Sequence, residues 1–244
     1  SNFRLNDFRL RIELFKRQLK TIEHVHLNRM SEDQFGTYIE ELAYDPSYYR
    51  TVGPMIKKKL DAAHSIQVES GECVLTYATE MEEARLNIGD YAGMENVGGT
   101  FPIGEVFTEA KDFSKVNGEA MIYGFGDLSH LMKMYKPFKI IIKDSIVTGT
   151  EGAPPEFDQI LSLIRQDEEV MVREFGVGLN PAVGKHALVN DITAFERQKG
   201  LHFSLGEKHS IYSKPGLRPK HTRYHVDIFV DLERILVDGE ELVF

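Results

Sequence analysis

Cysteine is nearly absent from this chain of 244 residues, whose sequence contains only Cys73. A single cysteine excludes an internal disulfide framework and is typical of a reducing compartment, so we expect a cytoplasmic location. Apolar runs are also short, because no stretch approaches the ~18 consecutive apolar residues of a membrane-spanning helix. The basic, amphipathic N-terminal segment lacks the apolar core of a signal peptide. These absences predict no membrane partner.

Basic residues are outnumbered by acidic ones. The chain has 29 Lys and Arg against 38 Asp and Glu, which gives a net charge of -9. A general nucleic-acid binder needs a basic face to neutralise phosphates, so we expect no nucleic-acid partner. The glycines between Gly89 and Gly104 do not have the GxGxxG spacing of a phosphate-binding turn that opens a helix. The acidic excess is compatible with a cation site, as it is with an ordinary soluble protein.

The chain changes in character near residue 65. Before it, apolar residues recur at helical spacing across residues 3–30, and a Ser-x-x-Gln capping box at Ser31 predicts a second helix. A third helix is expected over residues 48–63, interrupted near Gly53 and Pro54. After residue 65, β-rich runs alternate with Gly-rich turns. We predict an α+β fold with a short helical region over residues 1–64, followed by a β-rich, mixed-sheet body over residues 65–244.

Turns and strands of this body can be placed locally. Strands are expected at residues 65–69, 73–78, 138–143 and from 172 onward, with a helix over residues 157–168. Asn-Gly accepts positive φ at both central positions of a hairpin turn, so the segment from Val116 to Glu119 predicts a hairpin. The segment from Val237 to Glu240, which contains Asp-Gly, predicts a second hairpin at the end of the chain.

A His-x-Asp pattern in the last predicted strand is the first sign of chemistry. Successive side chains of a strand point to opposite faces, so His225 and Asp227 share one face, about 7 Å apart at their Cα atoms. An imidazole and a carboxylate can converge on one divalent cation, and His202 is the first candidate for a third ligand. Five of the nine histidines fall in the last quarter of the chain: His186, His202, His209, His221 and His225. The simpler alternative is a hydrogen-bonded or solvated surface pair.

Two glutamates extend this candidate set. Glu105 follows a Gly-rich loop and enters a Val-Phe-Thr strand, which would hold it well as a ligand or a base. Glu174 lies in the strand that begins near Val172. On local grounds alone, a solvated loop glutamate explains Glu105 equally simply. The metal-centred interpretation therefore depends on whether these segments belong together.

In order and spacing, the segments resemble the metallo-aminopeptidases of the thermophilic aminopeptidase T/S type, from about Leu42 to the end of the chain. Gly104-Glu105-Val106-Phe107-Thr108, followed by Val116-Asn117-Gly118, looks like the first metal-glutamate segment of that family, and Glu174-Phe175-Gly176-Val177-Gly178-Leu179-Asn180-Pro181 looks like its second. His202-Phe203-Ser204-Leu205-Gly206 is similar to its His-x-x-Leu-Gly, and His225-Val226-Asp227 to its closing His-x-Asp.

The resemblance implies a dinuclear metallohydrolase that activates water to cleave an N-terminal amide. The implied metal ligands are Glu105, Glu174, His202, His225 and Asp227, around two divalent ions (Zn, Co or Mn). The expected partners are a small peptide or other small-molecule substrate and a second copy in a homodimer. Residues 1–64 would then be the remnant of a larger N-terminal α/β portion.

One departure from the family keeps other functions open. The family places a catalytic tyrosine seven residues after the histidine that matches His202, and this chain has His209 there, which we expect to be catalytic together with Glu105. The 2,5-dihydroxypyridine dioxygenase type shares the scaffold and uses one iron held by two His and one carboxylate, which His202, His225 and Asp227 would match as an Fe(II) site. A divergent member without activity is the third possibility.

Overall fold

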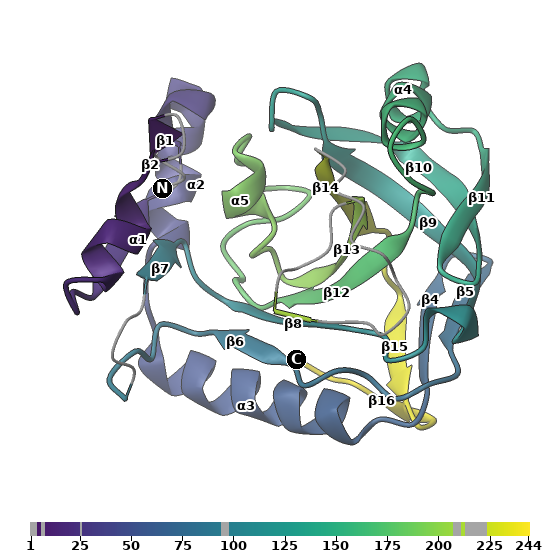
Figure 1. Cartoon of the computed structure of the whole chain (residues 1–244), viewed down its shortest axis with the longest axis horizontal. Helices are drawn as coiled ribbons and strands as arrows, with labels where there is room; N and C mark the ends of the chain where they lie inside the picture. Colours follow the sequence, from purple (N-terminus) through teal and green to yellow (C-terminus); the bar gives the residue numbers. More distant parts are fainter. Residues whose placement is uncertain (1–3, 6–7, 25, 94–97, 207–210, 213–223) are drawn as a thin grey trace.

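The computed structural model describes residues 4–5, 8–24, 26–93, 98–206, 211–212 and 224–244. Within these residues, 12 strands form one large sheet that curls on itself (Figure 1). The strand order along its main path is β16-β15-β4-β5-β9-β14-β13-β12-β8-β6, and the hairpin of β10 and β11 extends from β9. Its pairings are antiparallel. The predicted α+β fold class is confirmed.

The strands of this sheet come from residues 66 to 241. Their bounds are β4 Ile66–Ser70, β5 Cys73–Tyr77, β6 Arg85–Asn87, β8 Glu105–Glu109, β9 Val116–Gly126, β10 Met132–Lys143, β11 Ile146–Glu151, β12 Val172–Gly178, β13 Gly200–Gly206, β14 His225–Val230, β15 Arg234–Val237 and β16 Glu240–Glu241.

Helices and two small sheets surround the large sheet. The helical elements are α1 Leu10–Phe15, η1 Leu27–Arg29, η2 Glu32–Gln34, α2 Phe35–Glu41, α3 Pro46–Ala62, η3 Phe113–Lys115, α4 Pro155–Ile164 and α5 Ile192–Phe195. The small sheets pair β1 (Arg4–Leu5) with β2 (Phe8–Arg9), and β3 (Thr21–His24) in parallel with β7 (Gly98–Phe101). None of the described helices combines the length and the apolar character that crossing a membrane requires.

Helix α3 runs beneath β6 and β8 in Figure 1 and is continuous across Pro54, so the predicted interruption is wrong. The carboxylate of Asp45 caps its N-terminus by accepting hydrogen bonds from the backbone nitrogens of Ser47 (2.9 Å) and Tyr48 (3.2 Å). A Cβ at Gly53 would lie 2.6 Å from Ile88, so this glycine allows close packing against the neighbouring segment. Such packing offsets the hydrogen bond that Pro54 cannot donate.

The single helix expected over residues 3–30 is also wrong. Of the described residues there, Leu10–Phe15 form an α-helix and Leu27–Arg29 a short 3-10 helix, and β3 lies between them. Ile22 is 65% exposed, so the apolar periodicity does not face a core that would stabilise a long helix. Ser31 precedes the short turn η2 without a side-chain capping bond, and α2 begins only at Phe35.

The hairpin predicted at Val116–Glu119 is wrong, because this segment is the beginning of the long strand β9. Gly118 has a φ of 132°, and a Cβ at this position would lie 2.2 Å from the carbonyl oxygen of Val74 on β5. The glycine is thus required for close approach of two strands, and not for a turn. The terminal hairpin is confirmed, since Val237 pairs with Glu240 and both Asp238 and Gly239 have positive φ.

Strands β12, β13 and β14 are buried on both faces except at His225. One face belongs to the hydrophobic core and consists of Phe175, Val177, Leu201, Phe203, Leu205, Val226 and Ile228. The alternate positions are mostly polar and point to the opposite face, as the period of two requires. Buried polar groups are costly unless they are paired or bind a ligand, so this second face is where function is to be sought.

Candidate metal centre

Four neighbouring strands, β8, β12, β13 and β14, bring distant parts of the sequence to one face of the sheet. Antiparallel register pairs share a face, and here Glu105 lies opposite Gly178, while Gly176 lies opposite His202. On the next strand, Asp227 lies opposite Ser204. The five ligands suggested by the sequence all occupy this face: Glu105, Glu174, His202, His225 and Asp227.

His202 stands at the centre of the group and is fully buried. Its Nε2 atom lies 3.3 Å from Oε1 of Glu105 and 3.4 Å from Oε1 of Glu174. Ligand-type atoms of these three residues lie within 4.8 Å of one another, as do those of Glu196, His202 and Asp227. Two candidate metal-binding groups therefore share His202.

Space for the His202 ring is provided by Gly176 on the adjacent strand. A Cβ at Gly176 would lie 2.2 Å from Nε2 and 2.3 Å from Cε1 of the ring. Any larger side chain would displace the imidazole, because the register places the two residues directly opposite each other. The glycine in the sequence Glu-Phe-Gly thus helps to position the histidine.

Two residues of the site, Glu196 and Arg197, were not identified from the sequence. They directly follow α5, whose N-terminus is capped by Asp191 through the backbone nitrogens of Thr193 (3.0 Å) and Ala194 (3.2 Å). Figure 1 shows α5 beside the strands on the open side of the curled sheet. An adjacent Glu and Arg after a short helix has no distinctive spacing, so no local pattern could have revealed them.

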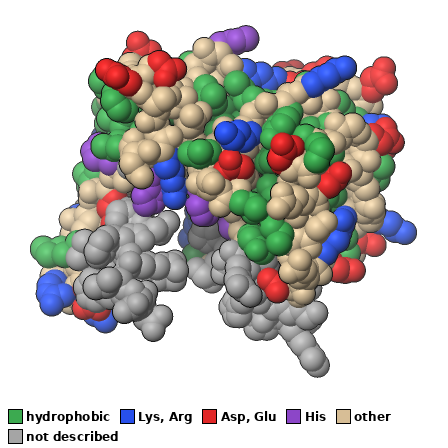
Figure 2. All heavy atoms as spheres, turned by 90° about the horizontal axis from the view of Figure 1, so that it is seen from above, with side chains coloured by type: hydrophobic (Ala, Val, Ile, Leu, Met, Phe, Trp, Pro, Cys, Tyr) green, Lys and Arg blue, Asp and Glu red, His purple; other side chains and the backbone are tan. Residues whose placement is uncertain are grey.

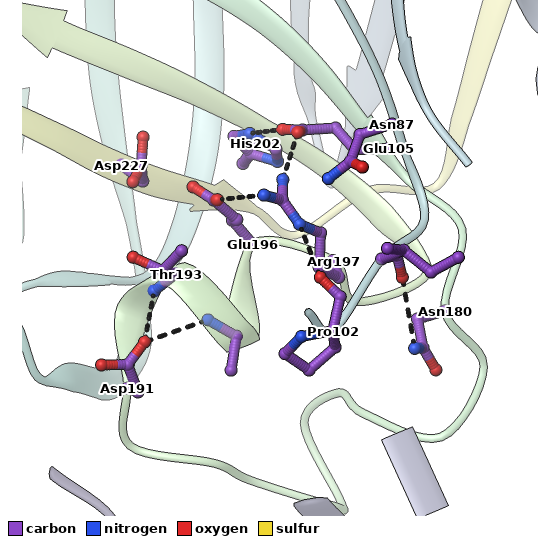
Figure 3. A network of polar contacts seen from close by, with 12 residues as sticks. Asn87, Pro102, Glu105, Asn180, Asp191, Thr193, Glu196, Arg197, His202 and Asp227 are labelled. Carbon is purple, nitrogen blue, oxygen red and sulfur yellow. Dashed lines mark hydrogen bonds and ion pairs between the residues drawn. The ribbon is translucent and has the colours of Figure 1, made fainter. Parts of the chain in front are cut away.

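Arg197 bridges the carboxylates of Glu105 and Glu196. Its Nη1 donates a hydrogen bond to Oε2 of Glu105, its Nη2 lies 2.9 Å from Oε1 of Glu196, and its Nε donates to the carbonyl oxygen of Pro102 at 3.4 Å (Figure 3). The Arg197 side chain is 6% exposed, and so is that of Glu105. Such a buried arginine fork holds both carboxylates in fixed positions.

The other end of the group reaches the protein surface. The side chain of His225 is 39% exposed, and its Nε2 lies 3.2 Å from Oδ1 of Asp227, whose own side chain is 6% exposed. Seen from above, one face of the molecule shows histidine, acidic and basic side chains near its centre (Figure 2). His209, the expected counterpart of the family tyrosine, lies outside the described residues.

Opposing effects set the charges of the site. Burial alone would raise the pKa of Glu105 and of Asp227, but the neighbouring positive groups together outweigh it, mainly Arg197 and His202 at Glu105 and His225 and His202 at Asp227, so both pKa values are lowered. At His202, burial alone would lower the pKa, yet the nearby carboxylates of Glu105 and Glu174 raise it well above its usual value. The acidic groups thus favour positive charge at the centre.

Glu196 behaves differently from Glu105, although both contact Arg197. Burial raises the pKa of Glu196 well above its usual range, and the neighbouring charges of Glu105 and Asp227 add to this effect. Arg197 opposes the shift without cancelling it. Burial and the acidic neighbours therefore favour the neutral form of Glu196.

The residues fit a divalent cation. Neither ring nitrogen of His202 makes a hydrogen bond of good geometry with a described residue, despite the short distances to the two glutamates, and Oδ1 of Asp227 is in the same state. Buried polar atoms without partners are rare because each costs free energy. Imidazole and carboxylate groups are the ligands that Zn²⁺, Mn²⁺ and Fe²⁺ take in proteins. A bound cation would satisfy these atoms together.

The sequence of the chain matches no family model and no curated protein. Solved structures, however, share its fold. The 2,5-dihydroxypyridine dioxygenase from Pseudomonas putida has a TM-score of 0.65 and 16% identity, over 99% of this chain and 68% of that chain. Wild-type AmpT from Thermus thermophilus has a TM-score of 0.60 and 13% identity, over 96% of this chain and 79% of that chain.

At these identities the likeness shows the fold and not the activity. The resemblance to aminopeptidases is therefore supported as a shared fold, and no specific family is shown. The chain shares the fold of a thermophilic aminopeptidase and of a dioxygenase, and it carries a buried group of residues that fits a divalent metal.

Proposed function

We propose that this protein is a metal-dependent hydrolase that cleaves the N-terminal amide of a small peptide or a related small molecule. One observation carries the proposal: the buried nitrogens of His202 lie among carboxylates and lack hydrogen-bond partners among the described residues. The shared fold with the aminopeptidase AmpT supports a hydrolase of this kind. When bound, a divalent cation supplies polarisation of a carbonyl group and lowers the pKa of a water molecule.

The residues of the chain would divide the remaining work. His202 and Asp227 would hold the cation. Glu105 is a poor candidate for the general base, because Arg197 holds its carboxylate. The carboxylate of Glu174 forms no ion pair with a described arginine or lysine and lies 3.4 Å from His202, so we assign to it the acceptance of a proton from water.

The exposed end of the cluster would receive the substrate. His225 is the member of the group that solvent reaches, so a substrate approaching the cation would meet this side chain first. The burial of His202 and Glu105 would keep bulk water away from the opposite end. A homodimer and a cytoplasmic location are further parts of the proposal, the latter supported by the single cysteine.

The test is an activity assay on metal-free protein reloaded separately with Zn²⁺, Co²⁺ or Mn²⁺. Aminoacyl anilides and dipeptides are the probes, and we expect chelator-sensitive release of the N-terminal amino acid. Asp231→Asn is the matched control, because Asp231 lies just after β14 and pairs with Lys185 outside the cluster. No release by metal-loaded protein would overturn the hydrolase. Oxygen uptake by Fe²⁺-loaded protein with a dihydroxypyridine would support a dioxygenase instead.

A further inference from the structure

We infer that this cluster binds a single divalent cation and that the guanidinium of Arg197 takes the place of a second one. The inference rests on the proposed metal-dependent function and concerns how many ions the site holds. It differs from the two-ion arrangement that the sequence resemblance implies. Two independent features of the described residues lead to it, namely the sharing of His202 and the contacts of Arg197.

His202 is common to both candidate groups, Glu105–Glu174–His202 and Glu196–His202–Asp227. A neutral imidazole has one nitrogen with a free lone pair, while the other carries a hydrogen. The ring can therefore coordinate one cation at a time. If one group is occupied, the other retains only two carboxylates, which is fewer than the three protein ligands typical of a catalytic zinc site.

Arg197 removes one more ligand from each group. Its guanidinium binds Glu105, which belongs to the first group, and Glu196, which belongs to the second. Arginine stays charged at every relevant pH, so it is a permanent positive charge between the carboxylates. It compensates negative charge in the way that a metal ion would, although it forms no direct ion pair with Glu174 or Asp227.

The two remaining carboxylates lie on either side of Ser204. Asp227 is the register partner of Ser204, and the backbone nitrogen of Glu174 donates a hydrogen bond to its hydroxyl oxygen at 3.2 Å. His202 lies two residues before Ser204 on β13 and points to the same face. Glu174 and Asp227 belong to different candidate groups that share His202, so a cation held by His202 and Asp227 has the Glu174 carboxylate close to the same imidazole, and His225 adjoins Asp227 at 3.2 Å.

Metal stoichiometry tests this inference without reference to activity. Metal-free full-length protein is titrated with Zn²⁺ by calorimetry, and the zinc retained after buffer exchange is measured by elemental analysis. We expect one ion per chain. Two tightly bound ions would overturn the inference and leave the metal-dependent function intact. No retained ion would overturn the proposed function itself, and with it the inference.

Matched variants then locate the ion. Glu174→Gln and Asp227→Asn should each weaken Zn²⁺ binding about 10-fold or more, since loss of even an outer partner costs about 10–100-fold. Glu105→Gln should change the affinity by less than about 3-fold, because Arg197 already holds this carboxylate, whereas loss of a residue that coordinates the ion weakens binding far more. Equal losses in all three variants would contradict the assignment.

Replacement of the arginine gives the converse result. Arg197→Gln frees Glu105 and Glu196, so we expect a second, weaker zinc ion to bind, while Arg197→Lys keeps the charge and should remain at one. An Arg197→Gln protein that folds and still takes a single ion would contradict the role of Arg197 as a replacement cation. If Arg197→Gln does not fold, the wild-type stoichiometry and the glutamate variants still decide the question.

Discussion

The two ends of the polar cluster differ in how a buried carboxylate is compensated. At the Arg197 end, a guanidinium that the chain itself provides binds the carboxylates of Glu105 and Glu196. At the Asp227 end, an equally buried carboxylate has one oxygen without a hydrogen bond of good geometry from a described residue, and it pairs with the half-exposed His225. The difference teaches that the first end has its counter-charge within the polypeptide, whereas the second leaves a buried oxygen open to a ligand.

The largest expected effect follows from removal of the guanidinium at the Arg197 end. Arg197→Gln leaves two buried carboxylates uncompensated, and breaking a buried ion pair costs about 3–5 kcal/mol of unfolding free energy. Urea denaturation of metal-free protein would measure this loss. The control is Arg234→Gln, because Arg234 pairs with Glu69 at 2.7 Å but is 49% exposed, so its loss should matter far less. Equal losses for both variants would show that Arg197 has no special stabilising role.

The next prediction concerns removal of the carboxylate at the Asp227 end. Asp227→Ala should lower metal affinity at least about 10–100-fold, because a carboxylate ligand is lost. The fold should survive without metal, since Val226 and Ile228 on the opposite face keep their packing. Thermal unfolding with and without chelator is the measurement, because a cation that binds the folded state raises the melting temperature. An equal chelator shift in wild type and variant would remove Asp227 from the site.

A smaller effect is expected at Gly176, which leaves space for the ring of His202 between the two ends. Gly176→Ala places a methyl group 2.2 Å from the ring of His202, so we expect a loss of about 1–3 kcal/mol in unfolding free energy from overpacking. Chemical denaturation would measure it. Gly149→Ala is the matched strand control, because its Cβ would meet only Ile141 at 3.5 Å. A harmless Gly176→Ala would mean that the histidine ring can move freely.

The last prediction concerns another buried carboxylate, that of Glu41. It has no hydrogen bond from a described residue to either oxygen, and burial raises its pKa to about 9. The folded state therefore binds a proton that the unfolded state releases above its usual pKa of 4.5. Stability should fall by at most about 1.4 kcal/mol per pH unit as pH rises between these two values.

Glu41→Gln should remove this dependence. The measurement is the free energy of unfolding of both proteins at pH 5 to 8, and the difference between them isolates Glu41 from other titrating groups. If the two proteins lose stability in parallel, Glu41 is charged in the folded state. Protonation would then not be one of the ways in which this protein compensates a buried carboxylate, and only an arginine and a cation would remain.

Part of the fold and site could be predicted from the sequence because it depends on local periodicity. Alternation along residues 225–230 places His225 and Asp227 on one face, and the structure has both there in β14. Asp-Gly at residues 238–239 predicts a hairpin, and it forms one. A local turn signal failed at Asn117-Gly118, because Gly118 allows a close contact between two strands and does not form a turn.

The ionic arrangement of the site was decided only by tertiary structure. Arg197 and Glu105 are 92 residues apart and meet because β8, β12 and β13 are adjacent in the sheet and α5 packs beside them. Spacing along the chain reports which side chains share a face of one strand, and here it determined which ligand types are present. Which strands become neighbours depends on the sum of long-range packing, so only the folded chain decides which carboxylate has an arginine and which is left for a metal.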